Sequence, residues 1–261
     1  MMRTLLFAFF ATTTTAAAVT PNLAHQLDTS SFAAATSDAT SSSTIGNVAV
    51  DTPLGLVIGT NEDPRFANSN GNNNNVDAFL GLQFGIIPSR FTKSRTSTTQ
   101  NDYTYQPGVR QANGSTGAPY IDATDFGPYC YQALDNMPFY EDQEQSEDCL
   151  YLNIWRPKGT NPQSELSVMV LIGNGFNIQG APQPPSWGHN LAREENVMVI
   201  SINYRLGVFG FMATDDEGSN GMNGVDDQRV ALEWIYKFIP YFGGNIILVT
   251  AKVGDKLVYP F

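Results

Sequence analysis

The side chains that could carry acid–base chemistry are few and poorly placed for it. The 261 residues contain two histidines, His25 in a polar segment near the N-terminus and His189 in a polar stretch that is typical of a surface loop. The carboxylate pairs Glu147–Asp148 and Asp226–Asp227 are adjacent in sequence, and adjacent residues do not face one another on a helix or a strand. We therefore expect structural and surface roles for Glu147 and Asp148. Arg205 is expected to pair with a carboxylate, with Asp148 as the hypothetical partner.

The overall composition excludes several kinds of partner. The chain has 14 basic and 25 acidic residues, which gives a net charge of −11. Nucleic acid is not an expected partner, because phosphate binding needs clustered Lys and Arg. No stretch of about 20 apolar residues predicts a membrane span. Neither cysteine lies at a metal-ligand spacing from a histidine, so no metal site is predicted.

The N-terminus has the three parts of a secretory signal peptide. Arg3 supplies the charged start, Leu5–Ala11 supplies a short apolar core, and Ala16–Ala18 offers small residues for cleavage. We therefore predict a signal peptide over residues 1–18, a flexible lead-in over residues 19–47 and a secreted, extracellular protein. A disordered tail of Ala and Thr is the alternative for the first residues.

Secretion leads to two further predictions. The two cysteines of the chain are Cys130 and Cys149, and an oxidising compartment would let them form a disulfide. Closing a loop of that size would stabilise the fold by about 3 kcal/mol. The chain also carries one glycosylation sequon, Asn113-Gly114-Ser115. This makes Asn113 the candidate glycan site, although a sequon alone is a weak signal.

Any site needs a rigid scaffold, and the strongest structural signal in the chain is Val197–Ile202. This short, uncharged run is rich in β-branched residues, which is typical of a strand buried on both faces. Its candidate neighbours are Val168–Ile172 before it and Ile246–Val253 after it. A helical pattern lies between them over Gly224–Ile239, ended by Pro240. The order of strand, strand, helix and strand predicts an α/β sheet.

Weaker signals outline the other elements. Val48–Ile58 predicts a small hairpin, Leu150–Trp155 predicts a strand, and Asn190–Asn196 predicts one or two helical turns. After a polar interruption, the apolar run of the central strand resumes over Leu206–Phe211. Thr92–Gly117 is polar and aperiodic, which predicts a long irregular insertion on the surface or a disordered segment.

A distinctive run, SEDCLYLNIWRP, occupies Ser146–Pro157. It resembles the signature of the type-B carboxylesterases, a family that includes carboxylesterases, cholinesterases and related fungal lipases. Further matches follow in the order of the family: Asp122–Cys130, which resembles the stretch with its first disulfide cysteine, then Asn203–Phe211, Asn223–Gln228 and Phe242–Gly244. The resemblance extends from Val48 to Gly244.

The resemblance implies a fold and an activity. The fold class would be α/β, as the N-terminal half of an α/β-hydrolase. Residues 48–261 would form one domain, with an incomplete, mostly parallel central sheet, flanking helices and an N-terminal antiparallel hairpin. The activity of the family is hydrolysis of carboxylic esters by a Ser, an acid and a His, with no cofactor or metal. The His takes the proton of the serine hydroxyl and the acid orients the His. An ester is therefore the expected substrate of a full-length form.

The family also has an oxyanion loop, His-Gly-Gly-Gly, which would follow the strand at Val168–Ile172. Backbone N–H groups in such a loop face the developing negative charge, and each is worth about 2.7–4 kcal/mol. This chain has Gly173-Asn174-Gly175-Phe176, so that Asn174 and Phe176 replace glycines in an alignment without a gap. Phe176 is the worse change, because Asn tolerates positive φ better than most residues. Gly173, Asn174 and Gly175 are thus candidate but degenerate oxyanion positions, and a plain turn is the alternative.

No catalytic residue is predicted in this chain. The Gly-x-Ser-x-Gly nucleophile elbow of the family should follow Phe242–Gly244, but Lys256 stands where the serine is wanted and no serine follows Ser219. The acid and the base would come later still, so the order of the chain also argues against His189 as the base. We expect a truncated, inactive esterase fragment that a frameshift, an aberrant transcript or a gene-model error interrupts near Asn245.

A secreted, non-catalytic protein with a binding or adhesion role is the alternative, because the family contains members that lack the serine. A parallel sheet that stops after its third or fourth strand leaves an apolar edge and uncovered faces. Such an edge favours a protein partner or aggregation.

Overall fold

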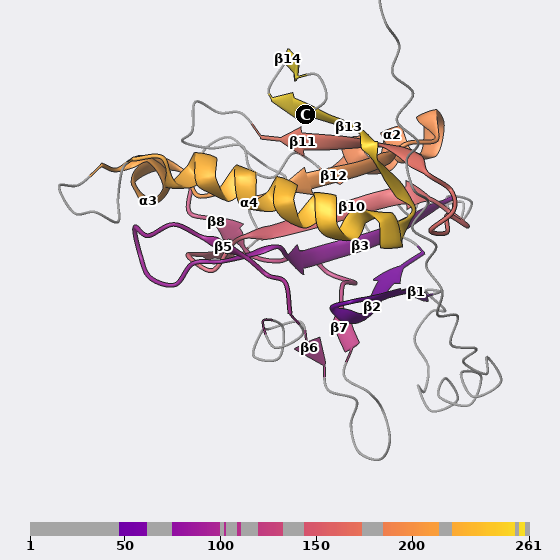
Figure 1. Cartoon of the computed structure of the whole chain (residues 1–261), viewed down its shortest axis with the longest axis horizontal. Coiled ribbons are helices and arrows are strands. Elements are labelled where there is room, and N and C mark those ends of the chain that lie inside the picture. Colours follow the sequence, from indigo (N-terminus) through magenta and orange to yellow (C-terminus); the bar gives the residue numbers. More distant parts are fainter. Residues whose placement is uncertain are drawn as a thin grey trace, which may run out of the picture. The chain divides into compact units, whose positions relative to one another are not determined.

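A computed structural model describes residues 47–61, 75–99, 102, 109–110, 120–132, 144–173, 185–213, 221–253 and 256–258. Most of its strands join one sheet (Figure 1). The spatial order is β14 (Lys256–Val258), β13 (Gly244–Val253), β11 (Leu166–Ile172), β12 (Met198–Ile202), β10 (Tyr151–Pro157), β3 (Val76–Gln83), β2 (Gly55–Thr60), β7 (Tyr120–Asp122) and β6 (Val109–Arg110), with β1 (Asn47–Thr52) paired to β2.

Smaller elements surround this sheet. Two short strand pairs stand apart from it, β4 (Gly85–Ile86) with β5 (Arg95–Thr96) and β8 (Tyr129–Cys130) with β9 (Gln145–Ser146). The described helices are α2 (Pro185–Glu195), α3 (Gly207–Phe211), α4 (Asn223–Phe238) and the 3₁₀ helix η2 (Ile239–Phe242).

The fold class is α/β as predicted, but the sheet is mixed rather than mostly parallel. β11 pairs in parallel with both β12 and β13, which gives the predicted parallel centre. β10 then pairs antiparallel with β12 on one side and with β3 on the other. The hairpin β1–β2 is antiparallel as predicted. The direction of a strand depends on how the chain connects it to its neighbours. The apolar pattern within each strand therefore does not predict that β10 pairs antiparallel with β12 and β3.

The central strand β12 is buried on both faces, as its sequence predicts. Its residues alternate between two apolar clusters, with Ile200 in one and Val199 in the other. Helix α2 contributes Ala192 to the cluster of Val199. Helix α4, which crosses the strands in Figure 1, contributes the opposite layer through Val230, Ala231, Trp234, Ile235 and Phe238. The two helices therefore cover opposite faces of the sheet.

Three predicted elements take a different form in the structure. Leu206–Phe211 does not resume the strand, because Gly207–Phe211 forms the helix α3. Helix α2 begins at Pro185, earlier than predicted. Part of the predicted surface insertion Thr92–Gly117 is packed inside, since Ser94 and Ser97 are buried.

The chain enters β13 through a glycine turn. Gly243 has a φ of +91°, and a Cβ there would lie 2.4 Å from the carbonyl oxygen of Asn161. β13 then runs parallel to β11, with a register shift between Leu166 and Val168. Beyond Val253 the chain returns as β14, which pairs antiparallel with Ala251, Lys252 and Val253. The predicted strand after α4 is therefore present, and it is followed by a second strand.

Within the described residues, no helix is long and apolar enough to cross a membrane.

Candidate active site

The candidate site lies at the carboxyl ends of the parallel strands β11 and β12. Ligands of open α/β sheets bind at this edge, where the loops that follow neighbouring strands meet. Gly173 directly follows β11, and Asn203 directly follows β12. Gly173 is buried at the end of its strand. Asn174 and Gly175, the other two candidate oxyanion positions, lie outside the described residues, as does the candidate glycan site Asn113.

A tyrosine joins the two strand ends. The hydroxyl of Tyr204 donates a hydrogen bond to the carbonyl oxygen of Gly173 at 2.7 Å, and both groups are buried. Burial raises the pKa of the Tyr204 phenol. The hydroxyl therefore keeps its proton, and its role as donor, at neutral pH. Nothing in the sequence singled out this tyrosine, except that it lies in the polar interruption that follows the central strand.

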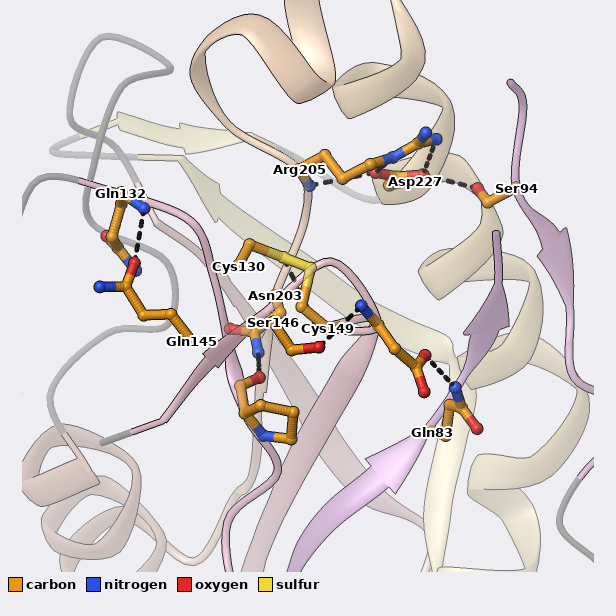
Figure 2. The surroundings of a disulfide bond; sticks show 12 residues. Gln83, Ser94, Cys130, Gln132, Gln145, Ser146, Cys149, Asn203, Arg205 and Asp227 are labelled. Carbon is orange, nitrogen blue, oxygen red and sulfur yellow. Dashed lines mark hydrogen bonds and ion pairs between the residues drawn. A yellow bond between two sulfur atoms is a disulfide. The ribbon is translucent and has the colours of Figure 1, made fainter. Parts of the chain in front are cut away.

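Asn203 fixes the backbone just before this tyrosine. Its N–H donates to the carbonyl oxygen of Tyr151 at 2.9 Å. Its side-chain amide donates to the carbonyl oxygen of Pro128 at 3.1 Å, as the dashed line in Figure 2 shows. These two contacts tie the end of β12 to the start of β10 and to the segment that leads into β8.

Arg205 fixes the backbone just after the tyrosine, and its partner is Asp227 rather than the predicted Asp148. Nε of Arg205 donates to Oδ2 of Asp227 at 2.8 Å, and a terminal nitrogen donates to Oδ1 at 2.7 Å (Figure 2). The backbone N–H of Arg205 also donates to Oδ2 at 3.0 Å. Both side chains are buried, with 4% and 0% of their surface exposed. This is a bidentate buried ion pair with its remaining acceptor positions occupied.

Residues of the supposed insertion complete that network. The hydroxyl of Ser94 donates to Oδ1 of Asp227 at 2.6 Å, and the carbonyl oxygen of Thr92 accepts from Arg205 at 2.7 Å. The network therefore joins three segments: the loop after β12, the start of α4 and the chain around β5. No sequence signal points to Ser94, because a polar residue in an aperiodic stretch is typical of an exposed loop.

Cys130 and Cys149 form a disulfide, as predicted. Cys130 ends β8, and Cys149 lies just before β10 begins. Both are buried, and Figure 2 shows the bond between the Asn203 contact and the Arg205–Asp227 pair. The disulfide therefore braces the segments that hold the end of β12.

Glu147 and Asp148 have the structural roles predicted for them. Glu147 forms an ion pair with Arg90, whose hydrogen bond lowers the pKa of the Glu147 carboxyl. Asp148 accepts a hydrogen bond from the side chain of Gln83 at 2.8 Å. Burial raises the pKa of the Asp148 carboxyl. Both acids line an open cleft of about 250 Å³. The described residues that line it supply carboxylates but no imidazole base.

His189 is not the surface-loop residue that the sequence predicts. It lies in α2 and is only 2% exposed. The preceding Gly188 packs on Trp155 of β10, so closely that a Cβ would lie 2.3 Å from the indole ring. Packing of α2 against the sheet therefore buries His189. Among the described residues, no cluster of three or more His, Cys, Asp or Glu side chains is arranged to hold a metal ion.

Asp102 gives the protein a testable acid dependence. Burial opposes its charge, but hydrogen bonds from Arg95, Thr98 and Thr99 outweigh burial and lower its pKa to about 2. Because this pKa lies below the ordinary value of 3.8, ionised Asp102 stabilises the fold above pH 4 or so, and the stabilisation is lost as the pH falls toward 2. We expect Asp102→Asn to cost about 1 kcal/mol at pH 7. Urea unfolding at pH 7, 4 and 2.5 should show that the difference in free energy of unfolding between wild type and Asp102→Asn shrinks as the pH falls. A difference that stays constant with pH would contradict the lowered pKa of Asp102.

Comparisons with known proteins agree with this architecture. The model of the carboxylesterase family matches residues 46–252. Carboxylesterase 1C of Rattus norvegicus is 37% identical over an alignment of 208 positions, and this alignment covers 77% of this chain and 35% of that protein. Acetylcholinesterase of Electrophorus electricus is 35% identical over an alignment of 206 positions, and this alignment covers 71% of this chain and 30% of that protein.

Solved structures give the same result. A PNB esterase structure superposes with a TM-score of 0.61 at 31% identity, over 78% of this chain and 38% of that one. Aspergillus niger EstA, at 22% identity and a TM-score of 0.61, shares the fold. The 261 residues therefore span about a third of the length of the relatives they match.

Proposed function

Because the chain belongs to the carboxylesterase family, we propose that it supplies the N-terminal scaffold of a carboxylic ester hydrolase. We further propose that the 261-residue polypeptide does not itself turn over esters. The Ser nucleophile, the acid and the His of a working enzyme would then be supplied by sequence outside these residues. The substrate of the whole enzyme would be a carboxylic ester, and the reaction would need no cofactor.

The observation that carries this proposal is the course of the chain after β13. A nucleophile elbow is a sharp turn from a strand into a helix, with the serine at its tip. Here the strand continues to Val253, and the chain returns as the antiparallel strand β14 instead of entering a helix. Lys256 opens that strand, and no serine occurs after Ser219. This region therefore offers no serine hydroxyl for attack on an ester.

The part that this chain would contribute is the frame of the site. The parallel pairs β13–β11 and β11–β12 set out the strand ends at which the oxyanion loop and the nucleophile of an ester hydrolase are placed. Gly173 stands at the first residue of the predicted oxyanion loop. The buried contacts of Asn203 and Arg205 support a rigid frame next to it.

The proposal is tested by an esterase assay on purified residues 19–261. With p-nitrophenyl acetate and p-nitrophenyl butyrate, we expect hydrolysis at the rate of a protein-free control, because no activated hydroxyl is available. Turnover above that rate that is stopped by a serine-directed organophosphate would contradict the proposal.

The genomic sequence downstream of the codon for residue 261 provides an independent test of the scaffold proposal. We expect it to contain a Gly-x-Ser-x-Gly segment and further esterase-like sequence in one of the reading frames. A stop codon with no such sequence downstream would contradict the scaffold proposal. Together with a cooperatively melting monomer that lacks turnover, that result would favour the non-catalytic binding role.

We also propose that the protein is secreted. The signal-like residues 1–18 and the buried disulfide support an oxidising route. Expressed in a eukaryotic secretory host, the protein should appear in the medium with Val19 as its first residue. A glycosidase that removes N-linked glycans should increase its gel mobility, and Asn113→Gln should abolish that change. Retention of Met1 on an intracellular product would contradict the assignment.

A further inference from the structure

Tyr204 is the side chain that holds the end of β11 in place. Its hydroxyl donates to the carbonyl oxygen of Gly173 at 2.7 Å inside the protein, and only 1% of the residue is exposed. We propose that Tyr204 is a positioning residue that fixes the orientation of the Gly173 carbonyl, the point at which the predicted oxyanion loop begins. This inference rests on the proposed function, which gives the loop after Gly173 its meaning.

The tyrosine is itself held firmly on both sides. Asn203 is bound to Tyr151 and Pro128 through its backbone and side-chain amides. Arg205 is bound to Asp227 through its backbone N–H and its guanidinium group. With its two neighbours anchored and its ring in the core, Tyr204 has little freedom to move. Its hydroxyl is therefore a fixed point against which Gly173 is placed.

A fixed carbonyl at Gly173 has a consequence for the loop. A peptide unit is planar and trans, so the hydrogen bond to the carbonyl oxygen orients the whole peptide plane that leaves Gly173. An oxyanion loop works through the direction of its backbone N–H groups, which must be set before charge develops. The hydroxyl of Tyr204 thus acts through the backbone and not by contact with a substrate.

The contribution of the hydroxyl can be separated from that of the ring. A phenylalanine at this position would keep the buried ring but would lose the donor, which leaves the Gly173 carbonyl without this bond. Tyr151 offers a matched control, because it is also buried and its ring packs on Gly127. Tyr204→Phe and Tyr151→Phe therefore each remove one buried hydroxyl, and only the first removes the bond to Gly173.

The experiment is nuclear magnetic resonance on the isotope-labelled 261-residue protein and the two variants. In Tyr204→Phe we expect the carbonyl ¹³C resonance of Gly173 and the amide resonance of Asn174 to shift. We also expect amide exchange at Gly173 to rise about threefold to tenfold, as loss of one neutral hydrogen bond predicts. Tyr151→Phe should leave these signals at their wild-type values.

Two outcomes would overturn the proposal. In one, Tyr204→Phe leaves the Gly173 and Asn174 signals unchanged. In the other, exchange rises by the same factor at Ile200 and Trp155 as at Gly173, which would mean that the hydroxyl only adds to overall stability. Neither readout depends on ester turnover, so failure here is distinguishable from failure of the proposed function.

Discussion

Replacing Arg205 with methionine is expected to lower the free energy of unfolding by about 3–5 kcal/mol, because it leaves a buried carboxylate without its counter-charge. Asp227 is fully buried and receives two hydrogen bonds from the guanidinium group. Methionine fills much of the same volume but offers no donor. The hydroxyl of Ser94 and the backbone N–H of residue 205 would remain, and neither carries a charge.

Arg90 provides the matched control. It forms an ion pair with Glu147, but 59% of its side chain is exposed. Exposed pairs contribute about 0–1 kcal/mol. Arg90→Met makes the same chemical substitution as Arg205→Met, so it should change the free energy of unfolding little. Urea unfolding of both variants and of wild type makes the comparison. A cost below about 1 kcal/mol for Arg205→Met would mean that the buried pair adds nothing beyond an exposed one.

A double variant distinguishes loss of the pair from loss of packing. Arg205→Met with Asp227→Leu removes both charges, and replacing a buried ion pair with apolar residues is often neutral or stabilising. We expect the double variant to be more stable than Arg205→Met alone. A double variant that is less stable would show that the shape of the network, rather than its charge balance, holds the end of β12.

An element can be predicted from the sequence when its pattern of apolar and polar residues is local and distinctive. The sequence predicts the strand β12 correctly, because an uncharged run of β-branched residues indicates a buried strand from only a few consecutive positions. The segment Gly207–Phe211 is not predicted correctly, because a short apolar run with two glycines fits a strand or a helical turn equally. The helix forms with Gly210 packed so closely on Arg205 that a Cβ would lie 2.1 Å from its carbonyl oxygen.

The contacts of the site were less predictable than its strands. The sequence predicts Asp148 as the partner of Arg205, and this prediction is wrong. A charged residue pairs with whichever carboxylate the fold brings near, and Asp227 lies on a separate helix. The polar neighbours of His189 predict a surface position, but the helix that carries it packs on the sheet through Gly188 and Trp155, and the histidine is buried. The hydrogen bond of Tyr204 links two strand ends that meet only in the folded sheet. Side-chain partners of this kind are not encoded in local sequence patterns.

Removing the disulfide is the second change with a large expected effect. Replacing Cys130 and Cys149 with serine should lower the free energy of unfolding by about 3 kcal/mol, because the open chain gains the conformational freedom that the closed loop denies it. The two cysteines are 19 positions apart, and the entropy lost on closing a loop of this length corresponds to about 3 kcal/mol. The two serines also place buried hydroxyls in an apolar cluster, so a Cys→Ala pair should be measured in parallel.

Reduction tests the same bond without a mutation. Dithiothreitol should destabilise the wild type to the level of the Cys→Ala pair and should leave that pair unchanged, since no other cysteine exists in the chain. If the wild type withstands reduction that is verified by thiol titration, the bond contributes little to stability. Because the disulfide and the contacts of Asn203 brace the same segments, its loss should also raise amide exchange at Asn203 more than at α4. An equal rise at both places would mean that the bond acts through the unfolded chain alone.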